Sequence, residues 1–382
     1  MSDRMMQFGD SLIALDYDLE VRLAQWDALR TRMVRSVPPE FTRDEWAYLV
    51  GFVAKEHLYE AFVVSFGMEG SDPAKSLIRP RGPIAIWLPS NVSLLGPLVL
   101  VLASLTGAPM RVKAGSKSND LCAAFVQFAI NNLGDGSLRD YLRDRVRIER
   151  FDRHDPRNAE MAANAGVRIA FGSDAAMAAI HALPHPVDSI GISFGDHRSE
   201  AWVEADALDD AAVTTLMKVF AIYGQAGCTS PRRVVMLGGS EAHCHALRDR
   251  MLKLWPTTMK ADAPMHVASL NVMHAQLNAA SGWDVKLTHR NGAVLGVGPV
   301  DKAEMSGLMS LAIVPGTVEQ AVAMLPPNIQ TIGHLVKDSS QLIQVIGRTK
   351  AKRFVPVAQM HHFGPVWDGQ NFFRQLFEEV AL

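Results

Sequence analysis

The feature that most constrains the fold of this chain is an alternation of short apolar segments with helix-like segments, beginning at residue 84. Residues 84–88, 110–113, 146–151, 167–171 and 189–194 have the length and apolar character of buried strands. Between them, residues 94–105, 119–132, 158–164 and 174–182 have helical patterns. This alternation is typical of a parallel sheet covered on both faces, with ligands at the carboxyl ends of its strands. We therefore predict an α/β fold.

The alternation resumes after a helical segment at residues 209–222, which indicates a second α/β domain. Its strands and helices are expected at residues 233–236, 241–254, 293–297, 311–314, 318–324, 329–335 and 340–346. The apolar residues of 255–292 fit neither period. A chain of 382 residues with 48% apolar side chains is large enough for two cores. We place the first domain at residues 1–224 and the second at 225–382, with the alternative that the C-terminal segment returns to the first.

The residues before the alternation, about the first 75, are expected to be mostly helical. Residues 17–35 are amphipathic, and residues 42–66 open with Thr42 and Glu45, the spacing of a capping box. The apolar stretch 92–108 is near the lower length limit for a membrane span and contains Gly96 and Pro97. Because short apolar strands flank it, we interpret it as a buried crossover helix and predict no membrane span.

The charges and cysteines limit the partners and the compartment. Thirty-eight Lys and Arg residues against 40 Asp and Glu residues leave a net charge of −2, without the basic run that a nucleic-acid-binding arm needs. Three cysteines in so long a chain argue against a disulfide framework and for a reducing compartment. The N-terminal residues lack a signal-peptide pattern, so we expect a cytoplasmic protein. The adjacent His361 and His362 would point to opposite faces of a strand, and we predict no metal site.

The most informative segment for chemistry is Gly-Gln-Ala-Gly-Cys-Thr-Ser-Pro-Arg-Arg at residues 224–233. Its glycines allow the backbone to approach a ligand and would expose the thiol of Cys228 near the expected domain junction. Cys228 is therefore a candidate nucleophile. The alternative is that Cys228 is buried and acts as a small apolar side chain, which is the commonest situation of a free cysteine.

This segment resembles the nucleophile segment of the aldehyde dehydrogenase superfamily. Residues 84–91 (Ile-Ala-Ile-Trp-Leu-Pro-Ser-Asn), 106–113 and 171–173 (Phe-Gly-Ser) follow in that superfamily's order. Within it, the chain is most similar to the LuxC-type acyl-CoA reductases of bacterial bioluminescence. That similarity rests also on residues 193–195 (Ser-Phe-Gly), 353–356 (Arg-Phe-Val-Pro) and 367–369 (Trp-Asp-Gly). It implies a Rossmann-type cofactor domain, a second α/β catalytic domain and a helical N-terminus.

The resemblance also assigns roles to residues of the reaction. Cys228 would attack a thioester carbonyl, and the side-chain amide of Asn91 would stabilise the oxyanion. Taken alone, Asn91 is better interpreted as a turn residue after Pro89. The implied substrate is an acyl-CoA or another acyl-thioester, and the implied partners are a second copy of the chain or an acyl-donor protein.

A nicotinamide cofactor is implied by the same resemblance. Lys113 would reach the adenosine ribose, and Gly172, Ser173 and Gly195 would belong to the cofactor site, with pyrophosphate at the start of the helix after Ser173. Without the resemblance, Lys113 would be interpreted as a solvated charge and Ser173 as a helix N-cap.

The choice of cofactor follows from charge. Arg111 and Lys117 add positive charge near this site, which favours NADPH over NADH. NADH remains the alternative.

One departure from the superfamily bears on the reaction. Ser193 stands where hydrolytic members carry the glutamate that activates water. Without that base, coenzyme A rather than water is expected to accept the acyl group. Glu200 and Glu204 are the alternative bases. The expected function is an acyl-CoA reductase that forms an aldehyde through an acyl-cysteine with hydride from NAD(P)H; the alternative is a non-redox acyltransferase or interaction subunit.

Overall fold

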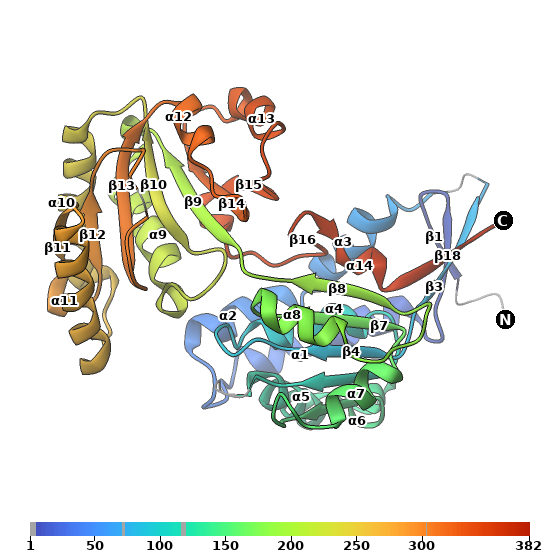
Figure 1. Ribbon diagram of the computed structural model, residues 1–382. Coiled ribbons are helices and arrows are strands. Elements are labelled where there is room, and N and C mark those ends of the chain that lie inside the picture. The colour runs from blue at the N-terminus through green and yellow to red at the C-terminus, as the bar shows by residue number, and fades with distance from the viewer. Residues whose placement is uncertain (1–4, 71–72, 116–119, 303) are drawn as a thin grey trace. The chain divides into compact units, whose positions relative to one another are not determined.

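The computed structural model describes residues 5–70, 73–115, 120–302 and 304–382, which form two units (Figure 1). The first unit comprises Met1–Gly195 and Phe363–Leu382, and the second comprises Asp196–His362. This division lies earlier in the chain than the expected boundary between residues 1–224 and 225–382. The reason is that β9 (Arg198–Val203) pairs with β10 (Pro231–Leu237) and β14 (Ile329–Leu335), which places β9 inside the sheet of the second unit.

The first unit contains a five-stranded parallel sheet of order β6-β5-β4-β7-β8. Its strands are β4 (Ile84–Trp87), β5 (Met110–Lys113), β6 (Val146–Glu149), β7 (Val167–Phe171) and β8 (Ile190–Phe194). All five were predicted, two of them with the same bounds. The chain adds strands in one direction from β4 through β6 and then returns to pair β7 with β4, so the strand order reverses between β4 and β7.

Helices cover this sheet, and Figure 1 shows α4 and α8 beside it. They are α4 (Leu95–Ser104), α5 (Leu121–Asn132), α6 (Ser137–Asp144), α7 (Arg157–Ala163) and α8 (Asp174–His181). Every residue of α4 from Gly96 to Ser104 is buried, which confirms the crossover helix between β4 and β5. Among the described residues, no helix combines the length and apolar character needed to cross a membrane.

The N-terminal region contains three helices: α1 (Leu19–Met33), α2 (Arg43–Phe52) and α3 (Lys55–Phe66). The predicted capping box is present, because Thr42 and Glu45 exchange hydrogen bonds at the start of α2. The expectation of a mostly helical start is wrong for residues 5–14. These form β1 (Met5–Phe8) and β2 (Ser11–Ala14), which join β3 (Ser76–Pro80) in a second sheet.

The C-terminal residues complete the first unit. They form β16 (Val366–Trp367), β17 (Gln370–Asn371), α14 (Phe372–Gln375) and β18 (Phe377–Ala381). β18 pairs antiparallel with β3 and forms one edge of this four-stranded sheet. Its aromatic neighbours fill the core, with the rings of Phe373 and Phe62 5.1 Å apart and those of Phe377 and Phe66 5.3 Å apart. Burying such large rings is the main stabilising contribution of this segment.

The second unit contains a seven-stranded sheet of order β11-β12-β13-β10-β9-β14-β15, parallel except for the edge strand β11. The strands not yet given are β11 (Asp284–Leu287), β12 (Val294–Val297), β13 (Ser310–Gly316) and β15 (Arg353–Pro356). The α-helices are α9 (Asp210–Ala221), α10 (Glu241–Thr258), α11 (Met265–Ala280), α12 (Val318–Ala323) and α13 (Ser340–Ile346). Short 3-10 turns occur at Ala205–Ala207, Ile222–Gln225, His289–Asn291 and Val357–Gln359.

This sheet separates two apolar cores. Val234 and Met236 of β10 point into a core shared with α9 and α10, whereas Val235 points into the opposite core with Trp202. Alternate residues of a strand face opposite sides, so both faces of β10 are buried. The sequence pattern of a continuous apolar run is explained by this double burial.

Candidate active site

The carboxyl edge of the first unit's sheet carries five of the six predicted site residues. Lys113 ends β5, Asn91 lies in the loop after β4, Gly172 and Ser173 lie between β7 and α8, and Gly195 follows β8. Parallel strands end at the same edge, and the strand order reverses between β4 and β7. Open α/β sheets bind their ligands at such a reversal. Cys228 belongs to the second unit.

The turn between β7 and α8 is built around Gly172 and Ser173. Gly172 has φ of 154°, which favours glycine, and its N–H donates to the carbonyl of Phe194 at 3.1 Å. The Ser173 side chain caps α8 by accepting from the N–H of Ala176 at 3.3 Å. Gly195 lies beside this helix start, where a Cβ would be 2.5 Å from a carboxylate oxygen of Asp174. A side chain at 195 would therefore collide with the first residue of α8.

Lys113 is oriented by its neighbours on the next strand's loop. Its ammonium nitrogen lies 5.5 Å from the ring centroid of Phe151, and the Arg157 guanidinium lies 4.4 Å from the same centroid. Burial lowers the pKa of Lys113, and the charge of Asp152 partly opposes this effect. Lys113 is thus a partly buried cation at the carboxyl end of β5.

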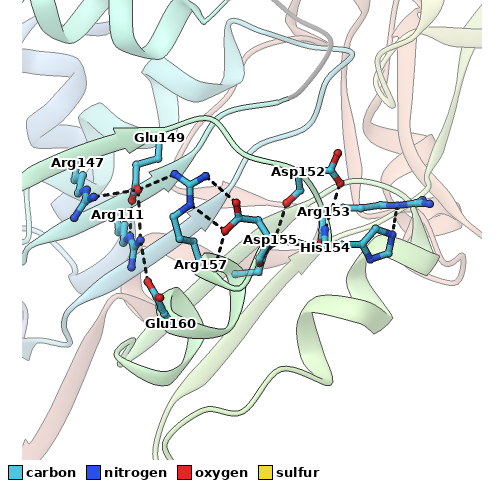
Figure 2. Close-up of polar contacts among 10 residues, drawn as sticks. Arg111, Arg147, Glu149, Asp152, Arg153, His154, Asp155, Arg157 and Glu160 are labelled. Atoms are coloured by element: carbon cyan, nitrogen blue, oxygen red, sulfur yellow. Dashed lines mark hydrogen bonds and ion pairs between the residues drawn. The ribbon is translucent and has the colours of Figure 1, made fainter.

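A cluster of charged residues lies on β5, on β6 and in the segment that follows β6 (Figure 2). Arg111, Arg147 and Arg157 all approach the carboxylate of Glu149, at 2.5, 3.2 and 3.6 Å. The Arg111 guanidinium, through its hydrogen bond, holds the pKa of Glu149 below its usual range. Arg111 also reaches Glu160 at 3.6 Å, so its charge is already balanced by two carboxylates. The second cation expected here, Lys117, lies outside the described residues.

A buried asparagine, which sequence reasoning missed, connects this cluster to β4. Asn158 accepts from the indole N–H of Trp87 at 3.0 Å and donates to the carbonyls of Asp152 and Asp155 at 3.1 and 3.0 Å. It is 7% exposed. The loop after β6 is therefore anchored to the strand that leads to Asn91, which is itself in an exposed part of its loop.

In the second unit, the turn before Cys228 has an unusual backbone. Tyr223, Gly224 and Gln225 have φ of 51°, 61° and 62°, three consecutive left-handed residues, two of which carry side chains. Such conformations persist only where the surroundings enforce them. Here Gln225 is fully buried, and its amide nitrogen donates to the carbonyls of Pro231 and Ser310, both at 2.9 Å. Its amide oxygen accepts from the N–H of Ser310 at 3.1 Å.

The segment after this turn is held from both sides. The Ser199 hydroxyl donates to the carbonyl of Cys228 at 2.7 Å, and the Thr229 side-chain oxygen lies 2.5 Å from Nδ1 of His361. Nε2 of His361 lies 2.8 Å from the carbonyl of Val219. A carbonyl only accepts, so Nε2 carries the proton. Burial lowers the pKa of His361 to about 4, so the ring is neutral and Nδ1 accepts from Thr229.

The three cysteines are unbridged and differ in exposure. Cys122 and Cys244 are 2% and 0% exposed, whereas Cys228 is partly exposed. Burial raises the pKa of Cys122 and raises that of Cys244 to about 12. A thiol must ionise to act as a nucleophile, so these two are protected from reaction. Among the described residues, no three His, Cys, Asp or Glu side chains are grouped to bind a metal ion.

The two carboxylates considered as alternative bases have other partners. Glu200 is 3% exposed and accepts from Arg233 at 2.6 Å; burial raises its pKa, and the charge of Arg233 opposes that rise. Glu204 lies at the carboxyl end of β9, five residues and roughly 16 Å along the strand from Ser199. Its side chain accepts from the N–H of Lys337 at 3.0 Å. Neither arrangement supplies a base beside Cys228.

The serine in the position of the missing glutamate has a partner of its own. The Ser193 hydroxyl lies 2.6 Å from Nε2 of His181, and its carbonyl accepts from the Gln370 amide at 3.2 Å. His181 ends α8. This histidine was not identified from the sequence, because nothing in the spacing of residues 181 and 193 links a helix end to an edge strand.

The two sheets and their connections define an aldehyde dehydrogenase-like fold, as predicted. The chain is similar to a putative aldehyde dehydrogenase from Burkholderia cenocepacia with a TM-score of 0.69 and 14% identity, covering 96% of this chain and 88% of that one. An NAD-dependent aldehyde dehydrogenase from Sinorhizobium meliloti gives 0.67 and 14%, covering 96% and 82%. Lactaldehyde dehydrogenase from Escherichia coli gives 0.64 and 14%, covering 95% and 86%.

Comparison of the sequence with family profiles is more specific. The profile described as acyl-CoA reductase (LuxC) matches residues 67–378, most of the chain. The chain belongs to the LuxC acyl-CoA reductase family, and its function is that of an NAD(P)H-dependent acyl-CoA reductase. A search of the curated proteins finds no significant match. The predictions of family, fold and function are therefore confirmed.

Proposed function

We propose that Cys228 is the residue that carries the acyl group in this acyl-CoA reductase. The observation that supports this role is the difference among the cysteines: two are sealed in cores, whereas Cys228 is partly exposed on a turn held by Gln225, Ser199 and Thr229. The amide of Asn91 and the backbone N–H of Cys228 are the proposed donors to the oxyanion. One such donor is typically worth about 3 kcal/mol in the transition state.

The proposed reaction has two covalent steps. The Cys228 thiolate forms a bond to the thioester carbonyl carbon as the carbon–sulfur bond to CoA breaks, and the departing CoA thiolate takes a proton from solvent. When bound, a nicotinamide would supply the hydride that this carbon needs. The resulting anion then expels the Cys228 thiolate, which releases the aldehyde and restores the enzyme.

The first prediction concerns this covalent intermediate. Incubation with radiolabelled acyl-CoA without nicotinamide is expected to give one hydroxylamine-labile acyl group on Cys228, and Cys228→Ala is expected to abolish it. Cys244→Ala, which removes a buried thiol, is the matched control and should label like the parent. Labelling of Cys228→Ala at the parental level, or mapping of the label to Cys122, would contradict the assignment.

We propose that the carboxyl edge of the first unit's sheet binds the nicotinamide cofactor. The residues there fit a dinucleotide: the N–H groups at the start of α8, after Gly172 and Ser173, suit pyrophosphate, and Lys113 is a half-buried cation one strand away. Gly195 keeps the start of α8 accessible. We propose NADPH as the cofactor, with NADH as the alternative.

The preference for NADPH is supported by the exposed guanidinium of Arg153 rather than by Arg111. Arg153 is exposed in the loop after β6, and its guanidinium donates to His154 at 2.9 Å (Figure 2). Arg111 is bound to Glu149 and Glu160. An exposed guanidinium suits a 2′-phosphate, which it can contact through two hydrogen bonds.

The second prediction separates the two cations. Lys113→Ala is expected to weaken NADPH and NADH binding alike, because both share the ribose, while acylation of Cys228 stays near the parental rate. Arg153→Ala is expected to weaken NADPH binding alone by about 10- to 100-fold, since a charged hydrogen bond is worth roughly 1.5–3 kcal/mol. Titration of protein fluorescence measures both affinities, with Arg139→Ala as control. Equal losses for both nucleotides in Arg153→Ala would contradict the 2′-phosphate role.

We propose that coenzyme A, not water, exchanges with the acyl-cysteine. The support is that Ser193 replaces the activating glutamate, Glu200 is committed to Arg233, and Glu204 lies at the far end of β9. A thiolate needs no base to attack a thioester, whereas water does.

The third prediction tests this exchange in the oxidative direction. With aldehyde and NAD(P)⁺, added CoA is expected to accelerate NAD(P)H formation by about 10²–10⁴-fold, the usual contribution of a general base that water would lack. The product is expected to be acyl-CoA, identified by mass spectrometry. Rapid formation of free acid without CoA would show that a base does act there, and His181 would be the first group to replace.

We propose that a second copy of the chain packs on α11. Its exposed residues His266, Leu270, Met273, Leu277 and Ala280 recur at spacings of four and three, the pattern of a helix–helix seam. Leu270, Met273 and Leu277 are 45–51% exposed. The helix contains no Asp, Glu, Lys or Arg, so an identical helix can pack against it without charge repulsion.

We also propose a cytoplasmic location for the protein, which its three free cysteines support.

The fourth prediction concerns this seam. The parent protein is expected to sediment as a dimer, and Leu277→Glu as a monomer, because a charge would be buried at the seam. Gln276→Glu adds the same charge one residue away and is expected to remain dimeric. A monomeric parent, or a dimeric Leu277→Glu, would contradict the proposal and leave α11 as a surface for an acyl-donor protein.

A further inference from the structure

The residue after the proposed nucleophile has a buried partner that the reaction scheme does not use. Thr229 is 5% exposed, and its side-chain oxygen lies 2.5 Å from Nδ1 of His361, 132 positions later in the chain. Both residues belong to the second unit. A hydroxyl buried against a histidine contributes nothing to solubility or surface charge, so its place directly after the proposed nucleophile calls for another explanation.

The histidine itself is fixed by a second contact. Its Nε2–H donates to the carbonyl of Val219 at 2.8 Å, in the last turn of α9. That bond sets the tautomer and the ring orientation, and leaves Nδ1 as an acceptor directed at Thr229. His361 follows the 3-10 turn Val357–Gln359, so the contact joins three elements: α9, this turn and the segment with Cys228.

The same histidine has no capacity left for a ligand. Both ring nitrogens are hydrogen-bonded inside the second unit, so neither is left to bind a substrate or a cofactor. His361 does not act as an acid or a base at Cys228, because its Nδ1 is hydrogen-bonded to the Thr229 hydroxyl instead.

We infer that His361 is a positioning residue for the nucleophile, acting through the hydroxyl of Thr229. The Cys228–Thr229 peptide is held on one side by the Ser199 hydroxyl at the Cys228 carbonyl and on the other by His361 at the Thr229 side chain. The first bond holds the Cys228 carbonyl and the second holds the next residue, so together they restrict the backbone from which the Cys228 side chain projects. The inference rests on the proposed role of Cys228.

The experiment compares variants that differ by a single oxygen atom. Thr229→Ser keeps the hydroxyl and Thr229→Ala removes it, and the single-turnover rate of Cys228 acylation by radiolabelled acyl-CoA is measured for each. We expect Thr229→Ser to acylate at near the parental rate and Thr229→Ala about 10- to 100-fold more slowly, the usual effect of misplacing a reacting group by about 1 Å. The affinity for NADPH, which a positioning role does not involve, should stay unchanged.

A double-variant comparison tests the histidine. His361→Phe removes the acceptor and is expected to slow acylation as much as Thr229→Ala, and the combined variant is expected to be no slower than either alone, because both remove one interaction. Thr215→Val, which removes a hydroxyl bonded within α9, is the control for loss of a threonine hydroxyl. His361→Gln provides both an acceptor and a donor and is expected to restore part of the rate.

The outcomes are distinct from those for Cys228 itself. If the parent protein carries no label on Cys228, the proposed nucleophile is wrong. If the parent is labelled and Thr229→Ala acylates at the same rate as Thr229→Ser, the positioning role is wrong. Additive rate losses in the double variant would also overturn it. Should His361→Phe not fold, the Ser and Ala variants at 229 decide the question alone.

Discussion

The buried amide of Gln225 is the interaction on which the arrangement around Cys228 depends. It makes three hydrogen bonds, to the start of β10 and the start of β13, in a position without solvent. Leaving buried polar groups unpaired costs about 1–3 kcal/mol each, so this network has few alternatives. It holds the left-handed backbone at Tyr223 and Gly224, which would otherwise relax, and so determines where the chain enters the segment that contains Cys228.

Buried carboxylates of this protein also depend on specific partners. Glu149 and Glu200, the most buried of the carboxylates discussed above, are each bound to arginines on neighbouring strands. A buried ion pair is expensive to break, because the remaining charge has no partner. These two carboxylates, near the proposed cofactor site and the proposed nucleophile, are therefore engaged in ion pairs. This supports the proposal that CoA, which needs no general base, accepts the acyl group.

Much of the fold was predictable because short apolar strand segments alternate with helical segments along the chain. β5 and β7 match their predicted bounds, since glycine and proline mark the turns around them. β9 was missed because its first half, Arg-Ser-Glu, is polar; Glu200 is buried there because the side chains of Arg233 and Trp202 donate hydrogen bonds to it. α11 was unreadable because its pattern is inverted: it buries Asn271 and Asn278, which bond to loop carbonyls, and exposes its leucines.

Some residues of the proposed site could likewise be predicted from the sequence, and others could not. Residues with a local signature, such as Cys228 after its glycines and Ser173 before a helix, were predicted from spacing and resemblance. Gln225, Asn158 and His361 were not, because their roles come from partners 71 to 132 positions away in the chain or from carbonyls that any residue offers. A hydrogen bond to a distant backbone atom leaves no pattern in the sequence.

The division of the chain into units has a consequence for synthesis on the ribosome. The second unit is one continuous stretch, Asp196–His362, whereas the first is completed only by Phe363–Leu382, which supply β18 and the rings of Phe373 and Phe377. The segment that emerges first must therefore wait, with one sheet lacking its edge strand, while the segment behind it can already fold. Nascent chains of this protein expose unfinished N-terminal surface for longest, so that surface is where chaperones have most time to bind.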